Sequence, residues 1–226
     1  MRLAFDGLET AIDITPGYVS VLQIENSALF VRMVRSLDSL EGRFALEPYT
    51  FWVDDKEEKP SSSLMLVPDP LHLPWEDRFL IGEVLKRIER EFLEDEDLRR
   101  AVEKLDSSLA GRLMELGFGL NSDYGFGLEW DLKRYLKFRG FGVGESPDSS
   151  FLDNLVNFLS LALDAGFNRV ITFVNLKTFL TKKDIERFYE YVFYSKLNVM
   201  LLENASDDND YEYERKTVVD LQFLEH

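Results

Sequence analysis

The sequence contains no cysteine among its 226 residues. This absence excludes disulfide bonds, thiolate metal sites and a cysteine nucleophile, and it fits a reducing cytoplasm. Histidine is almost as scarce. Of the two histidines we give His226 no weight, because the terminal residues LEH resemble a cloning remnant ahead of a truncated tag. No nucleophile-elbow motif accompanies His72. Catalysis by histidine is therefore not expected.

Long apolar runs are also missing, and none approaches the roughly 20 residues that span a bilayer. The first ten residues carry acidic side chains where a signal peptide would be apolar. We therefore expect a cytoplasmic protein. Hydrophobic residues still make up 45% of the chain and aromatic residues 13%, which is enough to build a substantial core.

Positive charge is in short supply: 26 Lys and Arg face 42 Asp and Glu, which gives a formal net charge of −16. Taken alone, this balance argues against nucleic-acid binding, which depends on Lys and Arg. The placement of the cations matters as much as their number, and four fall within seven positions of one predicted helix. The alternative is that cations pair with nearby acids, as Glu83 can with Arg87. The candidate DNA-binding residues are Lys133, Arg134, Lys137 and Arg139.

Glycine-rich phosphate loops are absent too, since neither GxxxxGK[ST] nor GxGxxG before a helix occurs. The buried strand predicted around 170–174 is followed by the loop NLKTFL and then by a helix. Nucleotide-binding proteins often place glycines at such a junction, and this one has none. Thr181 is expected to cap the helix, with Asp184 in the capping-box position. These features predict a scaffold and not a nucleotide site.

Apolar periodicity divides the chain into strand-rich ends and a helical middle. We predict an α/β body, residues 1–74 and 150–226, into which a mostly helical domain, residues 75–149, is inserted. The strand–helix–strand unit from 170 to 203 should form a right-handed parallel crossover. Residues 54–63 are expected to be a charged surface loop. Strands are expected twice within 1–25 and at 44–53, 64–67, 169–175, 197–204 and 217–223, and helices at 27–37, 75–92, 96–116, 128–139, 151–166 and 182–195.

Carboxylates gather around a glycine-rich bridge at 117–127. Oxygen-rich clusters suit Ca²⁺ or Mg²⁺, although acidic clusters are more often solvated surface, and the EF-hand pattern does not fit. The candidate metal-ligating residues are Asp123, Glu129 and Asp131.

Two segments give the chain a resemblance to a known family. One is LMLVPDPL (64–71) followed by WEDRFLIGEVLKRIERE (75–91), and the other is RVITFVNLKTFLTKKDIERFYEYVFYSKLNVMLLEN (169–204). The chain resembles the short form of the DNA-end-binding spacer-acquisition proteins of type II-A CRISPR loci, the Csn family. The resemblance implies an α/β head domain with a partly parallel sheet, similar to a nucleotide-hydrolase core without its phosphate loop, and an inserted α-helical leg domain.

The resemblance also implies how the protein works. Members form ring-shaped homotetramers, bind Ca²⁺ and thread linear double-stranded DNA through a basic hole without sequence preference. They support spacer acquisition together with the Cas integrase pair and the effector nuclease, and no catalytic activity is assigned to them. In this chain glycines dilute the acidic run before the third leg helix, so calcium binding is expected to be weaker or lost.

Two other functions stay open. A metal-dependent nuclease would use the carboxylates near residues 115–131. A protein-binding adaptor would use the acidic surface and make no contact with DNA.

Overall fold

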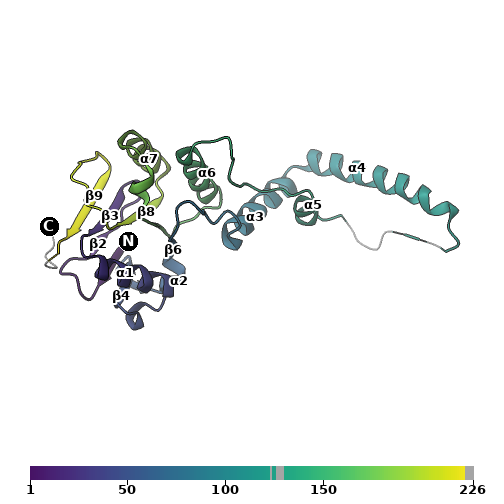
Figure 1. Ribbon diagram of the computed structural model, residues 1–226. Coiled ribbons are helices and arrows are strands. Elements are labelled where there is room, and N and C mark those ends of the chain that lie inside the picture. Colours follow the sequence, from purple (N-terminus) through teal and green to yellow (C-terminus); the bar gives the residue numbers. More distant parts are fainter. Residues whose placement is uncertain (123, 126–129, 222–226) are drawn as a thin grey trace. The chain divides into compact units, whose positions relative to one another are not determined.

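The computed structural model describes residues 1–122, 124–125 and 130–221. The chain divides into two compact units (Figure 1). Unit 1 comprises Met1–Trp75 and Glu145–His226, and unit 2 comprises Glu76–Gly144.

Unit 1 is built on a five-stranded sheet with the strand order β6-β7-β8-β3-β9. All of its neighbouring strands are parallel, which confirms a mixed α/β fold with a parallel sheet. The parallel pairing predicted for the crossover from 170 to 203 is confirmed, because β7 and β8 pair in parallel on either side of helix α7. The strands are β3 (Val19–Ile24), β6 (Leu64–Val67), β7 (Val170–Val174), β8 (Asn198–Glu203) and β9 (Glu214–Val219).

Unit 1 also contains a small antiparallel sheet of order β2-β1-β4-β5. Its strand β5 corrects the prediction of a surface loop at 54–63. Asp54 and Asp55 have φ angles of 46° and 62° and form the two-residue turn of a β-hairpin, without the Asn-Gly signal that usually marks one. The strands are β1 (Arg2–Phe5), β2 (Ile12–Asp13), β4 (Tyr49–Val53) and β5 (Lys56–Glu58), and the short helix α2 (Pro60–Ser63) follows.

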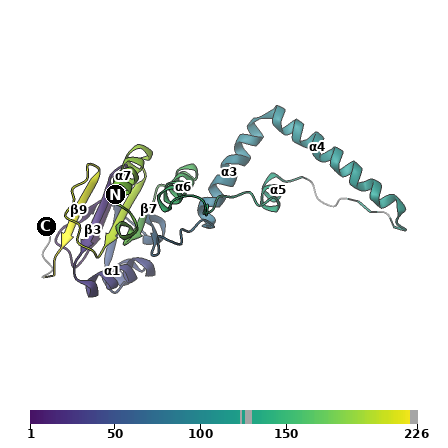
Figure 2. The same ribbon diagram turned by 45° about the horizontal axis from the view of Figure 1, so that its top comes forward.

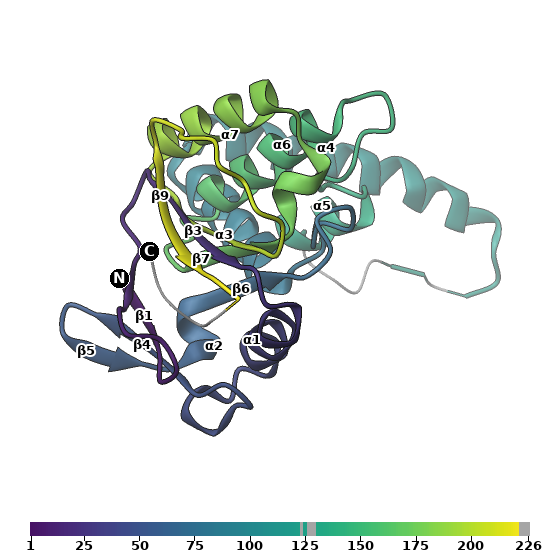
Figure 3. The same cartoon turned by 60° about the vertical axis from the view of Figure 1, so that its left-hand side comes forward.

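Both faces of the parallel sheet are covered (Figures 2 and 3). On one face, Leu22 and Leu202 share a buried cluster with Met33 of helix α1. Alternate residues point to the other face, where the Phe173 ring lies 6.2 Å from that of Phe188 on α7. Asn26 caps α1 as an acceptor from two backbone N–H groups. The helices of this unit are α1 (Ser27–Ser39), α6 (Phe151–Asp164) and α7 (Lys182–Ser195), with short 3₁₀ turns η1 (Gly42–Phe44) and η3 (Leu176–Phe179).

Several predicted strand boundaries were wrong. Residues 1–25 form three strands and not two, and they belong to different sheets, because alternation reveals a strand but not its partner. The strand predicted at 44–53 begins at Tyr49, after the η1 turn. The last strand begins at Glu214 instead of 217 and ends at Val219. Residues 222 and 223 of that prediction lie outside the described residues.

Unit 2 consists of helices. The Asp95 carboxylate accepts the Leu98 N–H at 2.9 Å and separates α3 from α4. The rings of Phe92 and Trp130 lie 5.3 Å apart and join α3 to the segment that enters α5. Of the helices within the described residues, none is both long and apolar enough to cross a membrane. The elements are α3 (Arg78–Glu94), α4 (Glu96–Glu115), η2 (Leu116–Gly119) and α5 (Leu132–Phe138).

The capping box of α7 is confirmed. Thr181 Oγ1 accepts the Asp184 N–H at 3.3 Å, and Asp184 Oδ2 accepts the Thr181 N–H at 3.1 Å. We expect Thr181→Ala to lower the free energy of unfolding by about 1 kcal/mol, because an orphan N–H of the first turn loses its acceptor. Urea denaturation measures this. Thr178→Ala, at an exposed threonine of the preceding turn, is the control, and equal effects of both variants would contradict the prediction.

Candidate functional site

The carboxyl ends of β3, β7 and β8 meet at one edge of the parallel sheet, which is where open α/β sheets hold their ligands. Here the protein's own side chains occupy that edge. The Asn204 backbone N–H donates to Asn175 Oδ1 at 2.9 Å, and Asn204 Nδ2 donates to the Ile24 carbonyl at 2.7 Å. One asparagine thus ties together the segments that follow three strands.

Lys177, in the loop after β7, is buried next to this edge, with a side chain only 8% exposed. Its Nζ lies 2.8 Å from Asp207 Oδ2 and 2.9 Å from Glu214 Oε2. Glu214 is itself shared, because Oε2 accepts the Tyr189 hydroxyl at 2.6 Å and Oε1 pairs with Lys216 at 3.0 Å. With two carboxylates as partners, Lys177 is not available to a phosphate. This network holds the loop at 204–213 against the sheet.

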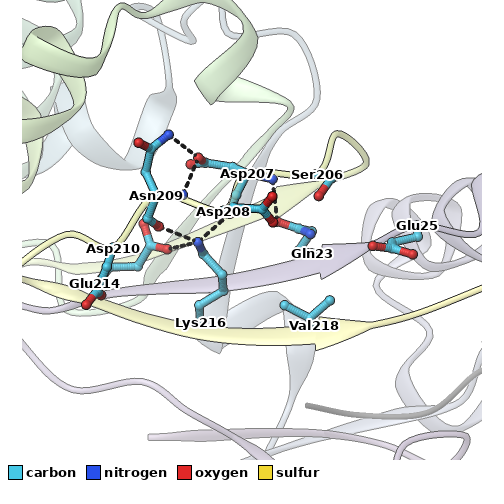
Figure 4. Close-up of a pocket in the computed structure, with 10 residues that line it drawn as sticks. All are labelled: Gln23, Glu25, Ser206, Asp207, Asp208, Asn209, Asp210, Glu214, Lys216 and Val218. Carbon is cyan, nitrogen blue, oxygen red and sulfur yellow. Dashed lines mark hydrogen bonds and ion pairs between the residues drawn. The ribbon is translucent and has the colours of Figure 1, made fainter.

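An open pocket with a volume of about 390 Å³ lies beside the network, between β3, β9 and the loop (Figure 4). Lys216 Nζ donates to the carbonyls of Asp207 and Asn209 at 2.6 and 2.8 Å. The Asp207 N–H donates to Gln23 Oε1 at 3.0 Å. The pocket's lysine and its central backbone groups are therefore already bonded to one another.

The pKa values of two carboxyl groups at this edge are shifted in opposite directions. Glu203 is 1% exposed; its Oε1 accepts the Lys177 N–H at 3.1 Å, and within the described residues its Oε2 has no hydrogen-bond partner. Burial therefore raises the pKa of Glu203 to about 7. For Asp207, burial also acts to raise the pKa, but hydrogen bonds from Lys177 and Asn209 outweigh it and lower the pKa to about 2.

Sequence reasoning did not single out Lys177, Glu203, Asp207 or Glu214. The one available signal was the run VMLLE, in which a carboxylate ends a fully apolar strand. Polar residues are seldom placed there unless they have buried partners. The partners come from segments distant in sequence, so the network itself could not be predicted.

The predicted DNA-binding residues lie on α5 and its C-cap. Lys133 Nζ pairs with Glu89 Oε2 of α3 at 2.5 Å, as the alternative interpretation expected. No ion pair joins the other three, Arg134, Lys137 and Arg139, to a carboxylate in the part of the chain that the structure describes.

Pairing with nearby acids also accounts for two cations of α3, as the alternative interpretation expected, although Glu83 and Arg87 have other partners than the predicted ones. Glu83 pairs with Lys86 at 2.6 Å, and Arg87 pairs with Glu91 at 3.0 Å. Elsewhere, His72 is an exposed loop residue whose Nδ1 lies 2.6 Å from Asp69 Oδ2, and this hydrogen bond lowers the pKa of Asp69.

The predicted metal ligands are not brought together by the structure as far as it is described. Asp123 and Glu129 lie outside the described residues. Asp131 caps α5, with Oδ1 accepting the Arg134 N–H at 2.7 Å, and for this reason the helix begins at Leu132 and not at 128. Residues 1–122, 124–125 and 130–221 contain no group of three His, Asp or Glu suited to a cation. The metal site stays a prediction.

The fold and this edge define an α/β protein with a parallel sheet. Its own side chains occupy the edge at which such sheets usually bind a ligand. The family model described as CRISPR-associated protein (Cas_Csn2) matches residues 46–221, and the chain belongs to this family. The resemblance found in the sequence is thereby confirmed. No sequence among the curated proteins matches the chain.

Solved structures agree on the fold. The crystal structure of Stu0660 of Streptococcus thermophilus is similar with a TM-score of 0.57 and 13% identity, over 97% of this chain and 75% of that chain. At that identity the likeness shows the fold alone. A putative ABC transporter (ATP-binding protein) from Pyrococcus furiosus has a TM-score of 0.38 and 8% identity, over 96% of this chain and 97% of that one, which is too weak to support an argument.

Glu203 makes stability depend on pH. Its pKa is about 7 in the folded protein against an ordinary 4.5, so the folded state binds this proton more tightly than the unfolded state does. The contribution of Glu203 to stability is therefore present below pH 4.5 and lost as the pH rises to about 7. Glu203→Gln should remove this loss. At high pH the free energy of unfolding of the variant should exceed that of the wild type by up to about 3 kcal/mol.

Urea denaturation at several pH values measures the difference between variant and wild type. Glu186→Gln, at an exposed glutamate of α7, is the control with the same change in formal charge. A difference between Glu203→Gln and the wild type that is independent of pH would show that the Glu203 carboxyl ionises as readily in the folded protein as in the unfolded chain.

Proposed function

We propose that this protein binds the ends of linear double-stranded DNA without sequence preference, as a ring-shaped homotetramer that supports spacer acquisition in CRISPR immunity. The proposal rests on membership of the Cas_Csn2 family. It places the protein in the cytoplasm beside the Cas integrase pair and the effector nuclease, as a non-enzymatic partner.

The observation that carries the DNA-binding part is the charge of α5. The segment 132–144 contains four cations and no Asp or Glu, in a chain of net charge −16. Three of its cations, Arg134, Lys137 and Arg139, are exposed and have no carboxylate partner among the described residues. An acidic surface repels DNA everywhere except where such a segment gathers phosphates, so the charge distribution orients binding.

The proposed self-association is supported by α4. None of its twenty residues is buried, yet exposed leucines recur along it at spacings of seven, four and four residues, which keep them on one helical face. An apolar stripe of this kind buries its surface most simply against another helix, and we assign a second copy of the chain to that role. The leucines are Leu98, Leu105, Leu109 and Leu113.

Calcium and the absence of catalysis belong to the proposal as well. The resemblance implies Ca²⁺, but two of the three candidate ligands lie outside the described residues, so we assign the ion no role in DNA binding.

DNA binding is tested by gel shifts at low salt with linear duplex and with closed circular plasmid, with and without Ca²⁺. We expect binding to linear DNA and little to the circle. Arg134→Glu with Lys137→Glu should weaken binding about tenfold or more and reduce the salt dependence, because phosphate contacts are lost. Lys133→Ala is the control, since Lys133 already pairs with Glu89.

Equal binding of linear and circular DNA would refute the preference for ends. Unchanged affinity of the double variant would place the contact on another element. Supercoiled plasmid incubated with Mg²⁺ or Mn²⁺ should stay uncut, and cleavage would favour the nuclease hypothesis.

The oligomeric state is tested by light scattering. The wild type should have the mass of a tetramer, and Leu105→Lys with Leu109→Lys should shift it toward smaller species, because charges in the stripe oppose its burial. Val31→Lys, at an exposed apolar residue of α1 in unit 1, is the control. A wild type that is monomeric at all concentrations would overturn the ring.

A further inference from the structure

Two phenylalanines at the end of α5 are exposed to solvent. Phe138 is 84% exposed and Phe141 is 50% exposed. Within the described residues neither ring contacts another aromatic ring, whereas Tyr135 of the same helix lies 6.4 Å from Trp130. Among the described residues, aromatic packing therefore accounts for Tyr135 and for neither phenylalanine.

The backbone at the end of α5 fixes the positions of the two residues that carry these rings. Gly140 has a φ of 68°, its N–H donates to the Lys137 carbonyl at 3.1 Å, and the Phe141 N–H donates to the Leu136 carbonyl at 2.9 Å. This pair of hydrogen bonds is a Schellman motif, which ends a helix in one defined geometry and favours a glycine at that position. The segment around Phe138 and Phe141 is thus an ordered helix end.

Charge alternates with the rings. Lys137 and Arg139 flank Phe138 directly in sequence, and both are exposed. No acidic residue lies between 132 and 144. Proteins that hold single-stranded nucleic acid combine these same two elements: cations that follow the phosphates and aromatic rings on which bases stack.

We propose that Phe138 and Phe141 stack on unpaired bases at a DNA end while Lys137 and Arg139 hold the adjacent phosphates. This inference rests on the proposed DNA binding and deepens it, because it names what distinguishes an end from the interior of a duplex. Bases inside a duplex are stacked on each other and offer no face, whereas a frayed or overhanging end does. Stacking tolerates any base, so the site needs no sequence preference.

Fluorescence anisotropy tests the inference with two probes of equal phosphate number, a thymidine oligonucleotide and a blunt duplex. Phe138→Ala with Phe141→Ala should weaken binding of the oligonucleotide about tenfold or more, as expected for lost base stacking. Binding of the blunt duplex should weaken much less, because only its frayed terminal bases offer a face to the rings and the cations are kept. Phe138→Trp should keep oligonucleotide affinity. Phe138→Ala alone separates the contribution of Phe138 from that of Phe141.

Phe44→Ala is the matched control, because Phe44 is 89% exposed and lies in unit 1. The inference is overturned if the wild type does not bind the oligonucleotide, or if the double alanine variant loses both probes equally or neither. It is also overturned if that variant loses mass in light scattering, since the rings would then join copies of the chain. Failure of the proposed function looks different: the wild type would not bind the blunt duplex.

Discussion

The ion pair between buried Lys177 and Glu214 is the interaction on which the carboxyl edge of the parallel sheet depends. Glu214 begins β9, the outermost strand, so Lys177 links the loop after β7 to the far side of the sheet. Asp207 adds a second carboxylate from the loop that leads to β9. Breaking a buried pair by removing one partner costs about 3–5 kcal/mol, because a charge is left without compensation. Loss of any of these ion pairs would therefore destabilise the folded state.

These internal ion pairs affect whether this edge of the sheet can bind a phosphate. In related architectures a helix N-terminus and a lysine at this edge meet a phosphate. Here the first turn of α7 is closed by Thr181 and Asp184, and Lys177 is neutralised by carboxylates of the chain itself. An anion would have to displace both. The parallel sheet then serves as a rigid support, and we expect contacts with partners on surfaces outside the sheet.

The sequence predicted those features that are encoded locally. The capping box and the helix after Asn26 follow from residues within a few turns of one another, and the parallel crossover follows from the order strand–helix–strand. The hairpin at Asp54 was missed because its turn lacks the usual Asn-Gly signal. The early start of β9 was missed because a polar, partly buried strand shows little alternation of apolar and polar residues. The network around Lys177 could not be predicted at all, since its members are separated by up to 37 residues and meet only through the sheet. For α5, the sequence located the cations, and the structure showed that Lys133 differs from its neighbours by pairing with Glu89.

In the proposed DNA contact, the exposed end of α5 supplies two contributions that respond differently to salt. Each phosphate contact steepens the fall of affinity with salt by about 0.9 in logarithmic slope, because counterions are released. Stacking of bases on Phe138 or Phe141 buries apolar ring surface and carries no such dependence. As salt rises, the phosphate contribution weakens along the whole duplex while stacking at an end persists. Under this proposal, a segment with three cations and two exposed phenylalanines would discriminate ends from duplex best at ionic strengths where charge alone no longer holds DNA.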